Sequence, residues 1–318
     1  MVRSKHLKAL TMSSDLPQAR LRHWALALMW VLPLLWAVNI VAARQAPGVV
    51  SPHVLALGRW GLAGCILSGL SWRELWSQRG YVWQHRWRYM ALGACGMWVC
   101  GAWIYLAGES TSAINISLIY ASAPVMIAVG SVLWLGERFS KRQVIGVVLA
   151  LLGVVHVVVR GDWCHLIQLQ LVPGDLWVVA AAIAWAAYAL LQKKWPSPLS
   201  ATARLASICM GGVVVLLPFA VWELMSEHTP VLGLHALQLI VVTALVPGLG
   251  AYWIYGWTQK ILGASRVAMT LYLGPLYSGG AAWLLLNESL GWHHVWGGVM
   301  ILSGVALVMA IKPASPTA

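Results

Sequence analysis

Ten long apolar runs divide the chain, and short segments that carry most of the charged residues separate them. Each run holds about 20 residues, enough for a helix to cross a ~30 Å hydrocarbon core. The runs are continuously apolar and do not alternate, so they predict helices, which satisfy their own backbone in lipid, and not barrel strands. The predicted spans are 24–43, 54–71, 89–108, 113–135, 142–159, 174–192, 203–222, 236–257, 266–286 and 292–311.

The first run follows a basic segment, as the apolar part of a secretory signal does. At about 20 residues it is longer than the 7–15 of a signal, so we expect a retained first helix. Composition agrees: 60% of the residues are hydrophobic, 9% are charged and the mean hydropathy is +0.75. That is too little charge to cover a soluble domain of 318 residues. The prediction is an all-α integral membrane protein whose loops leave no room for a separate domain.

Basic residues gather on one side of this membrane. With the N-terminus inside, eighteen of the 21 Lys and Arg residues are cytoplasmic, Arg44 and Arg160 lie outside, and Arg59 lies within a span. This bias sets the topology of multi-pass proteins, and it predicts that both termini are cytoplasmic. The net charge of +12 sits in short loops and not on one soluble face, so we expect no nucleic-acid partner.

Spans four and five recur as spans nine and ten. A shift of 151 residues aligns 113–159 with 264–310 without a gap. The matched pairs include Pro124 with Pro275, Glu137 with Glu288, Gly146 with Gly297, and Gly153 with Gly304. The chain therefore divides into a tail 1–23, a five-helix repeat 24–159, an external linker 160–173, a second five-helix repeat 174–311 and a tail 312–318.

Because five is odd, the second repeat must enter the membrane upside down relative to the first. The Glu137 turn carries Arg138, Lys141 and Arg142, whereas the Glu288 turn has no Lys or Arg. The first turn is therefore expected inside and the second outside. Inverted repeats are typical of secondary transporters, because two similar halves of opposite orientation can exchange roles as access alternates.

Two motifs add a family resemblance. Residues 135–139 read Leu-Gly-Glu-Arg-Phe after the mid-span Pro124, and residues 286–290 read Leu-Asn-Glu-Ser-Leu after Pro275. With the intramembrane Arg59, they resemble the EamA-type permeases of the drug/metabolite transporter superfamily over residues 24–311. The resemblance implies a ten-helix carrier of the bacterial-type inner membrane, commonly an exporter of amino acids or other small metabolites. It also implies a cavity formed mainly by spans one, three, four, six, eight and nine.

Arg59 is the candidate with the clearest chemistry, because an intramembrane charge is costly enough to indicate function by default. Two interpretations stay open: it attracts a substrate carboxylate, or it forms a structural ion pair with Glu109. Asn39 and aromatic rings on the cavity spans would bind the rest of an amphipathic solute, because each of these Trp and Tyr rings offers an apolar face and one polar group. The expected rings are Trp36, Trp98, Trp103, Tyr120, Trp185, Tyr188, Tyr252, Trp253, Tyr255 and Tyr272.

Other positions have expected structural roles. Pro124, Pro247 and Pro275 each remove a backbone hydrogen bond within a span, so they are expected to line the path or act as hinges, or else to form a kink for packing. The seven-residue spacing of Gly146 and Gly153, and of Gly297 and Gly304, indicates a close helix contact. The carboxylates of Glu137 and Glu288 are each expected to interact favourably with the N-terminal dipole of the helix that directly follows. His156 is expected to be a packing residue.

The sequence contains none of the motifs that an enzyme or an ATP-driven pump would need: no Ser/His/Asp arrangement, no HExxH and no P-loop. The five cysteines have no metal-ligand spacing, so neither a metal nor a cofactor is expected. The leading hypothesis is a secondary transporter of a small molecule, as a monomer or a homodimer in the lipid bilayer. The alternatives are a lipid-linked flippase or a non-transporting membrane partner on the same fold, with an intramembrane enzyme as a third.

Overall fold

The computed structural model describes residues 3–135, 140–164, 172–226, 230–262 and 273–309. These residues form helices and connecting turns, without a strand among them. Eight helical stretches are long and apolar enough to cross a membrane, judged by length and composition. The predicted all-α membrane fold is confirmed. Predicted spans nine and ten reach into residues outside the described ranges, and their described parts form the last two helices.

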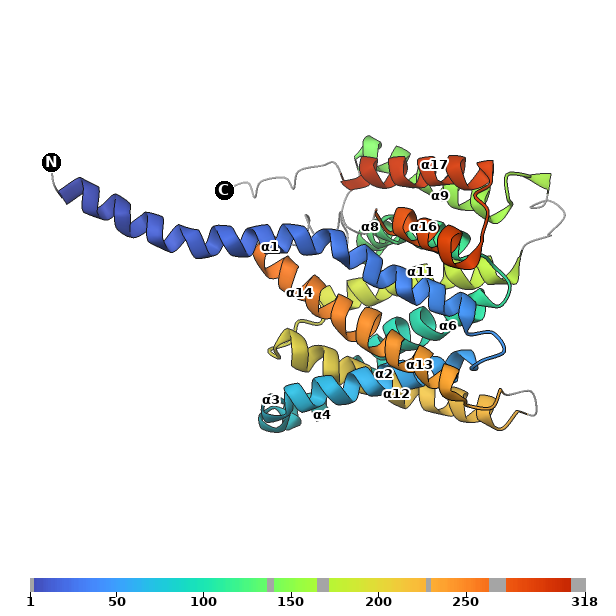
Figure 1. Cartoon of the computed structure of the whole chain (residues 1–318), viewed down its shortest axis with the longest axis horizontal. Helices are drawn as coiled ribbons and strands as arrows, with labels where there is room; N and C mark the ends of the chain where they lie inside the picture. The colour runs from blue at the N-terminus through green and yellow to red at the C-terminus, as the bar shows by residue number, and fades with distance from the viewer. Residues whose placement is uncertain (1–2, 136–139, 165–171, 227–229, 263–272, 310–318) are drawn as a thin grey trace.

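The first repeat contains nearly continuous helix. Its elements are α1 (Arg3–Gln45), α2 (Pro52–Leu70), α3 (Trp72–Ser77), α4 (Arg79–Gln84), α5 (Arg86–Gly93), η1 (Ala94–Ala102), α6 (Trp103–Gly108), α7 (Ala113–Tyr120), α8 (Ala123–Leu135) and α9 (Lys141–Val158). α1 begins ahead of the predicted first span, so the basic N-terminal segment continues the helix and projects from the bundle (Figure 1).

The second repeat follows the same order of spans, without counterparts of α3 and α4 among its described residues. Its elements are α11 (Pro173–Lys194), α12 (Ala201–Leu224), α13 (Leu234–Thr243), η2 (Ala244–Gly250), α14 (Ala251–Leu262), α16 (Gly274–Leu286) and α17 (Trp292–Met309). The two π-helical segments, η1 and η2, stand at equivalent points of the third span of each repeat. Pro247 lies inside η2 and cannot donate a backbone hydrogen bond, which favours a local change of helical register.

Both mid-span prolines stand in the first turn of a described helix. The fourth span divides at Ala121 and Ser122 into α7 and α8, directly before Pro124. In the second repeat, Pro275 stands in the first turn of α16. A proline is tolerated in a first turn because the N–H that it lacks has no helical partner there. A new helix therefore begins at Pro124, where a kink in one continuous helix was one expectation, and the residues that precede α16 lie outside the described ranges.

Helices of one repeat pack on their counterparts in the other. α9 packs against α17 and α2 against α12, so equivalent helices meet across the molecule. α1 packs against α14 and α16, and its counterpart α11 packs in the same way against η1, α6 and α8. The α9–α17 pair and the α2–α12 pair lie at opposite edges of the bundle (Figure 1). This exchange of partners is the pattern that a pseudo-two-fold axis between two repeats produces.

The glycine contact shows how the paired helices run. A Cβ added to Gly153 would lie 2.9 Å from the carbonyl oxygen of Gly297, and one added to Gly304 would lie 2.5 Å from that of Gly146. As the residue number rises along α17, the residue contacted on α9 falls, so the two helices are antiparallel. The start of α9 and the start of α17 consequently lie at opposite ends of the bundle, as the inverted repeat predicts.

The turn after α16 explains one difference between the two motifs. Asn287 has φ of 54°, the left-handed region, and its backbone N–H bonds to the carbonyl oxygen of Ala282. Glycine and asparagine are the residues that adopt this conformation most readily at a helix end. Asn287 is aligned with Gly136, which lies outside the described residues. The exchange is conservative because glycine and asparagine both adopt the left-handed conformation that Asn287 has.

Candidate functional site

A cavity of about 140 Å³ lies between the two repeats. Its wall comes from the six spans that the resemblance implies and also from α2. The lining residues are Trp36, Asn39, Ile40, Arg59, Trp60, Gly96, Cys100, Gly101, Ile104, Ile116, Ser117, Tyr120, Ala121, Ala123, Pro124, Trp185, Tyr252, Gly274, Pro275 and Ser278. Among them Arg59 is the one charged residue, so the cavity is an apolar and aromatic chamber with a single cation at its wall.

Neutral partners hold the guanidinium of Arg59 in place. Its side chain is 4% exposed, and its Nη1 donates to Asn39 Oδ1 at 2.6 Å and to Tyr105 Oη at 3.1 Å. The Tyr105 hydroxyl donates in turn to Asn39 Oδ1 at 2.9 Å. The guanidinium carbon lies 4.3 Å from the ring centroid of Trp60. Asn39 and Tyr105 therefore orient the cation without neutralising it.

The expected ion pair between Arg59 and Glu109 is absent from the described residues, where no carboxylate oxygen lies within 4.0 Å of the guanidinium. Glu109 instead stands exposed, just beyond the end of α6. Partial burial raises the pKa of Glu109, and the nearby carboxylate of Glu223 raises it further. The structure therefore contradicts the ion-pair interpretation: Glu109 is exposed, whereas Arg59 is buried.

Two donors in the cavity wall have no acceptor among the described residues. Arg59 Nε and Trp60 Nε1 are both buried and make no hydrogen bond there. Buried polar groups are hydrogen-bonded in the great majority of cases, and exceptions call for an explanation such as an absent ligand. Both residues line the cavity, so an acceptor such as a carboxylate is the group that would satisfy them.

Aromatic rings form most of the remaining wall. The Tyr252 ring meets Trp60 edge-on at 5.7 Å and meets Trp185 at 6.4 Å between centroids. Tyr120 lies 6.4 Å from Trp185, and its hydroxyl contacts Cys100 Sγ at 2.5 Å. These four rings come from both repeats and enclose a space that suits a flat or branched apolar group.

The structure brings together about half of the predicted binding residues. Trp36, Asn39, Arg59, Tyr120, Trp185 and Tyr252 line the cavity, as do Pro124 and Pro275. Tyr255 stands behind Trp36 at 5.7 Å, and Tyr188 stands behind Trp185 at 5.3 Å. Tyr272 lies outside the described residues. Tyr255 and Tyr188 back the wall without forming it.

Four other predicted residues lie elsewhere. Trp98 stacks on Phe219 at 4.3 Å and Trp103 meets Trp177 at 5.0 Å, so both fill contacts with α12 and α11. Trp253 is 58% exposed, because it follows Tyr252 and so points about 100° away around the helix. Pro247 is buried in η2 and is not part of the wall.

Several wall residues were missed from the sequence. Trp60 was missed because α2 was not expected among the cavity spans, although its neighbour Arg59 indicated that this helix faces inward. Ser117 lies three residues before Tyr120, and Ser278 lies three residues after Pro275. That spacing puts each serine on the same helix face as a predicted residue, and it was the signal that could have found them.

Glu288 has a structural role, but not at the helix that was expected. Its Oε1 accepts from Ala113 N at 3.0 Å and its Oε2 from Ile114 N at 3.2 Å, so it caps α7 and not α17. Arg44 Nε lies 3.3 Å from Oε1 of the same carboxylate. The cap crosses from the second repeat to the first. Its sequence counterpart, Glu137, lies outside the described residues.

A second polar cluster lies beside this cap. Asp175, fully buried in the first turn of α11, accepts from Asn115 Nδ2 at 3.1 Å and from the hydroxyl of Thr111. His294 Nε2 lies 3.0 Å from Asn115 Oδ1, and its Nδ1 accepts from Gly291 N. The cluster joins α7, α11 and α17 at one end of the bundle.

His156, which was expected to be a packing residue, has its ring centroid 6.1 Å from that of Trp163.

Comparisons with known proteins agree with this architecture. The sequence model described as the EamA-like transporter family matches residues 23–159 and again residues 172–310. The "Uncharacterized transporter YyaM" of Bacillus subtilis (strain 168) is 24% identical over 272 residues, which are 83% of this chain and 86% of that protein. An "Uncharacterized transporter" of Archaeoglobus fulgidus is 26% identical over 281 residues, 87% of this chain and 94% of its own.

A third relative has a more specific name. The "Probable amino-acid metabolite efflux pump" of Escherichia coli (strain K12) is 28% identical over 181 residues, 54% of this chain and 58% of its own. One solved crystal structure aligns over 89% of this chain and 96% of its own with a TM-score of 0.59 and 18% identity, a likeness that shows the fold alone. The family model covers both halves of the chain, and on that ground this multi-pass membrane protein belongs to the EamA-like transporter family.

Proposed function

We propose that this transporter is a secondary carrier that exports amino acids or related amphipathic solutes by alternating access between its two repeats. The observation that carries the proposal is the cavity between the repeats, an aromatic chamber whose one charged lining residue is Arg59, and where Arg59 and Trp60 each hold a buried donor without an acceptor among the described residues. Arg59 and Trp60 would receive the carboxylate of the solute. Trp185, Tyr120 and Tyr252 would pack around its side chain.

The size and character of the wall support a small solute. The cavity of about 140 Å³ has room for a small solute. A flippase on the same fold would gather its aromatic rings toward lipid, whereas six of the predicted residues line a central chamber. Names among the relatives also support transport, and one of them refers to amino-acid metabolites, which here is a statement about that protein alone.

Alternating access follows from the paired repeats. The inverted halves pack on each other through equivalent helices, so a rocking motion that closes one end of the cavity can open the other. We expect both termini on the cytoplasmic side of a bacterial-type inner membrane. We also expect a monomer or a homodimer, because the cavity is formed within one chain.

Counterflow in proteoliposomes tests the proposal. Vesicles that contain the purified chain are loaded with one unlabelled amino acid at a time and supplied with a trace of the same labelled compound outside. Uptake of label above that of protein-free vesicles is expected for at least one amino acid with an apolar or aromatic side chain. Amines and simple carboxylates complete the panel, and the absence of exchange for every compound would contradict the substrate class.

A further inference from the structure

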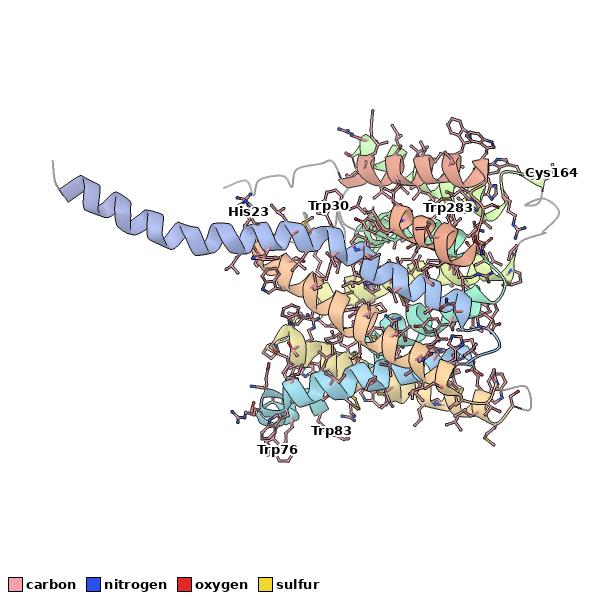
Figure 2. All side chains as sticks on the ribbon, in the orientation of Figure 1. His23, Trp30, Trp76, Trp83, Cys164 and Trp283 are labelled. Atoms are coloured by element: carbon pink, nitrogen blue, oxygen red, sulfur yellow. The ribbon has the colours of Figure 1, made fainter. Side chains whose placement is uncertain are left out.

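The residues between α2 and η1 form a surface with no part in the cavity. Residues 72–88, called the Trp–Arg segment here, comprise α3, α4 and the first residues of α5. They lie at the end of the bundle from which α1 projects, and Trp76 and Trp83 point outward there (Figure 2).

The basic groups of the Trp–Arg segment lack carboxylate partners. Its arginines are Arg73, Arg79, Arg86 and Arg88. Among the described residues, no carboxylate oxygen lies within 4.0 Å of any of them. Glu74 is the one acidic residue of the segment, and its two oxygens accept from Ser200 N and Ser200 Oγ, each at 2.6 Å. The segment therefore presents four positive charges that the protein does not balance.

Exposed indoles alternate with these arginines. Trp72, Trp76, Trp83 and Trp87 are 59, 67, 70 and 65% exposed. Two of the pairs repeat one geometry. Arg79 donates to the carbonyl oxygen of Trp76 at 3.0 Å with its guanidinium 4.9 Å from that ring, and Arg86 does the same at Trp83, at 3.0 and 4.7 Å. Each guanidinium is thus held over an indole by one hydrogen bond to a backbone carbonyl oxygen.

This combination matches the surface of an anionic lipid leaflet. Indoles collect at the level of the headgroups, where one edge is apolar and the other is wet. A guanidinium binds phosphate oxygens in pairs, and basic clusters directly beside a membrane span attract anionic lipids. The segment joins two spans, so it lies at this level. We propose that the Trp–Arg segment binds anionic phospholipid headgroups, with arginines on the phosphates and indoles at the boundary with the acyl chains.

Lipid binding at this site would also brace the contact between repeats. Glu74 belongs to the segment and caps α12 through Ser200, so the segment links α2 of one repeat to α12 of the other. Headgroups that fix the segment in the leaflet hold this cap in place. Anionic lipid should therefore stabilise the whole fold and not only adhere to it.

Thermal unfolding in nanodiscs tests the proposal without any transport substrate, so its outcome is independent of the proposed function. The chain is reconstituted in phosphatidylcholine alone and in phosphatidylcholine with phosphatidylglycerol, and the two unfolding midpoints are compared. We expect phosphatidylglycerol to raise the wild-type midpoint by a few degrees, and high salt to reduce that rise because it screens exposed charges. An unchanged midpoint would overturn the proposal.

Paired substitutions separate a specific site from general charge. The double variant Arg79→Gln, Arg86→Gln should lose most of the rise in unfolding midpoint that phosphatidylglycerol causes. Lys141→Gln with Arg142→Gln removes two exposed charges from the start of α9, at the same end of the bundle, and should keep it. An equal loss in both pairs would mean net charge alone and would overturn the proposal. If the Gln pair does not fold, Arg79→Lys with Arg86→Lys decides: the charge stays while the paired phosphate contacts are lost, so a full rise there would also contradict it.

Discussion

At the scale of the residue, we propose that Arg59 and Trp60 determine what the cavity recognises. Each leaves one buried donor without an acceptor among the described residues, and an unmet buried donor costs about 1–3 kcal/mol. A solute carboxylate that accepts from both donors would offset this cost, but only while the solute is bound. Asn39 and Tyr105 hold the guanidinium through Nη1, so its Nε stays without an acceptor among the described residues.

Substitution of Arg59 should separate charge from geometry. Arg59→Lys keeps the charge but loses the planar fork, so some exchange should remain. Arg59→Ala removes hydrogen bonds to a charged group, about 1.5–3 kcal/mol, and should lower exchange by about tenfold or more while the protein stays in the membrane. Counterflow rates normalised to protein abundance measure both effects.

The matched control for Arg59 is Glu109. Because no ion pair joins the two, Glu109→Ala should leave exchange and abundance near the wild-type values, and adding it to Arg59→Ala should restore nothing. Recovery of abundance and exchange in the double variant would mean that the two charges compensate each other in the membrane, and it would remove the substrate role of Arg59.

Sequence patterns located the inward-facing cation but not all of its surroundings. Arg59 stood out because charges inside spans are rare, and Trp36 and Tyr252 because they lie on expected cavity spans. Composition cannot say which way a ring points, so Trp253 was grouped with Tyr252 although it faces away. Trp98 and Trp103 were misplaced for the same reason: their faces are decided by packing against Phe219 and Trp177, which are distant in sequence.

At the scale of the element, three carboxylates cap helices that belong to the other repeat. Glu223 in α12 accepts from His53 N at 2.8 Å and from Val54 N at 3.2 Å, at the start of α2. Glu74, just beyond α2, caps α12 in return. Glu288 caps α7. The sequence predicted a helix-capping role for Glu288 but assigned it to the adjacent helix, since a cap supplied from the other repeat depends on the tertiary fold.

Loss of the Glu288 cap should weaken α7 and the contact between repeats. Removing a side-chain cap costs about 0.5–2 kcal/mol, and Glu288→Ala also leaves Arg44 without its carboxylate. We expect a lower midpoint in thermal unfolding for Glu288→Ala and a smaller decrease for Glu288→Gln, which keeps one acceptor. Glu109→Ala serves as the exposed control, and an equal decrease there would show that the effect is not due to the cap.

The contact between α9 and α17 should tolerate no added volume. A Cβ on residue 304 would lie 2.5 Å from a backbone oxygen and 2.6 Å from a backbone nitrogen of α9. Gly304→Ala must therefore push the helices apart, at about 1–3 kcal/mol. Gly280→Ala in α16 is the matched control, because no atom lies within 4 Å of its added Cβ. Unfolding midpoints should fall for the first variant only, and equal midpoints would contradict the close contact.

At the scale of the whole molecule, the architecture followed from two features of the sequence. The gapless repeat and the odd number of spans predicted inverted halves, and the antiparallel glycine contact between α9 and α17 agrees with that arrangement. The paired π-helical segments could not be predicted, because a change of hydrogen-bond register leaves the apolar pattern nearly unaltered. The division of the fourth span before Pro124 could not be predicted either, since a proline alone does not show whether the helix resumes its axis.

Topology is open to a direct test. Cysteines placed at positions 140 and 291 stand before α9 and α17, at opposite ends of the bundle. In a background without the native cysteines, an impermeant thiol reagent should label position 291 from outside intact cells and position 140 only after the membrane is opened. Labelling of both positions from the same face would contradict the inverted repeats.

The central claim is that the cavity recognises a solute through its carboxylate at Arg59 and Trp60. The most direct measurement is counterflow of an amino acid beside its decarboxylated amine, a pair with one side chain, in wild-type and Arg59→Gln proteoliposomes. The account predicts exchange of the amino acid and not of the amine by the wild type, and a loss of about tenfold or more for the amino acid in the variant. Equal exchange of both compounds, or an Arg59→Gln variant as active as the wild type, would contradict it.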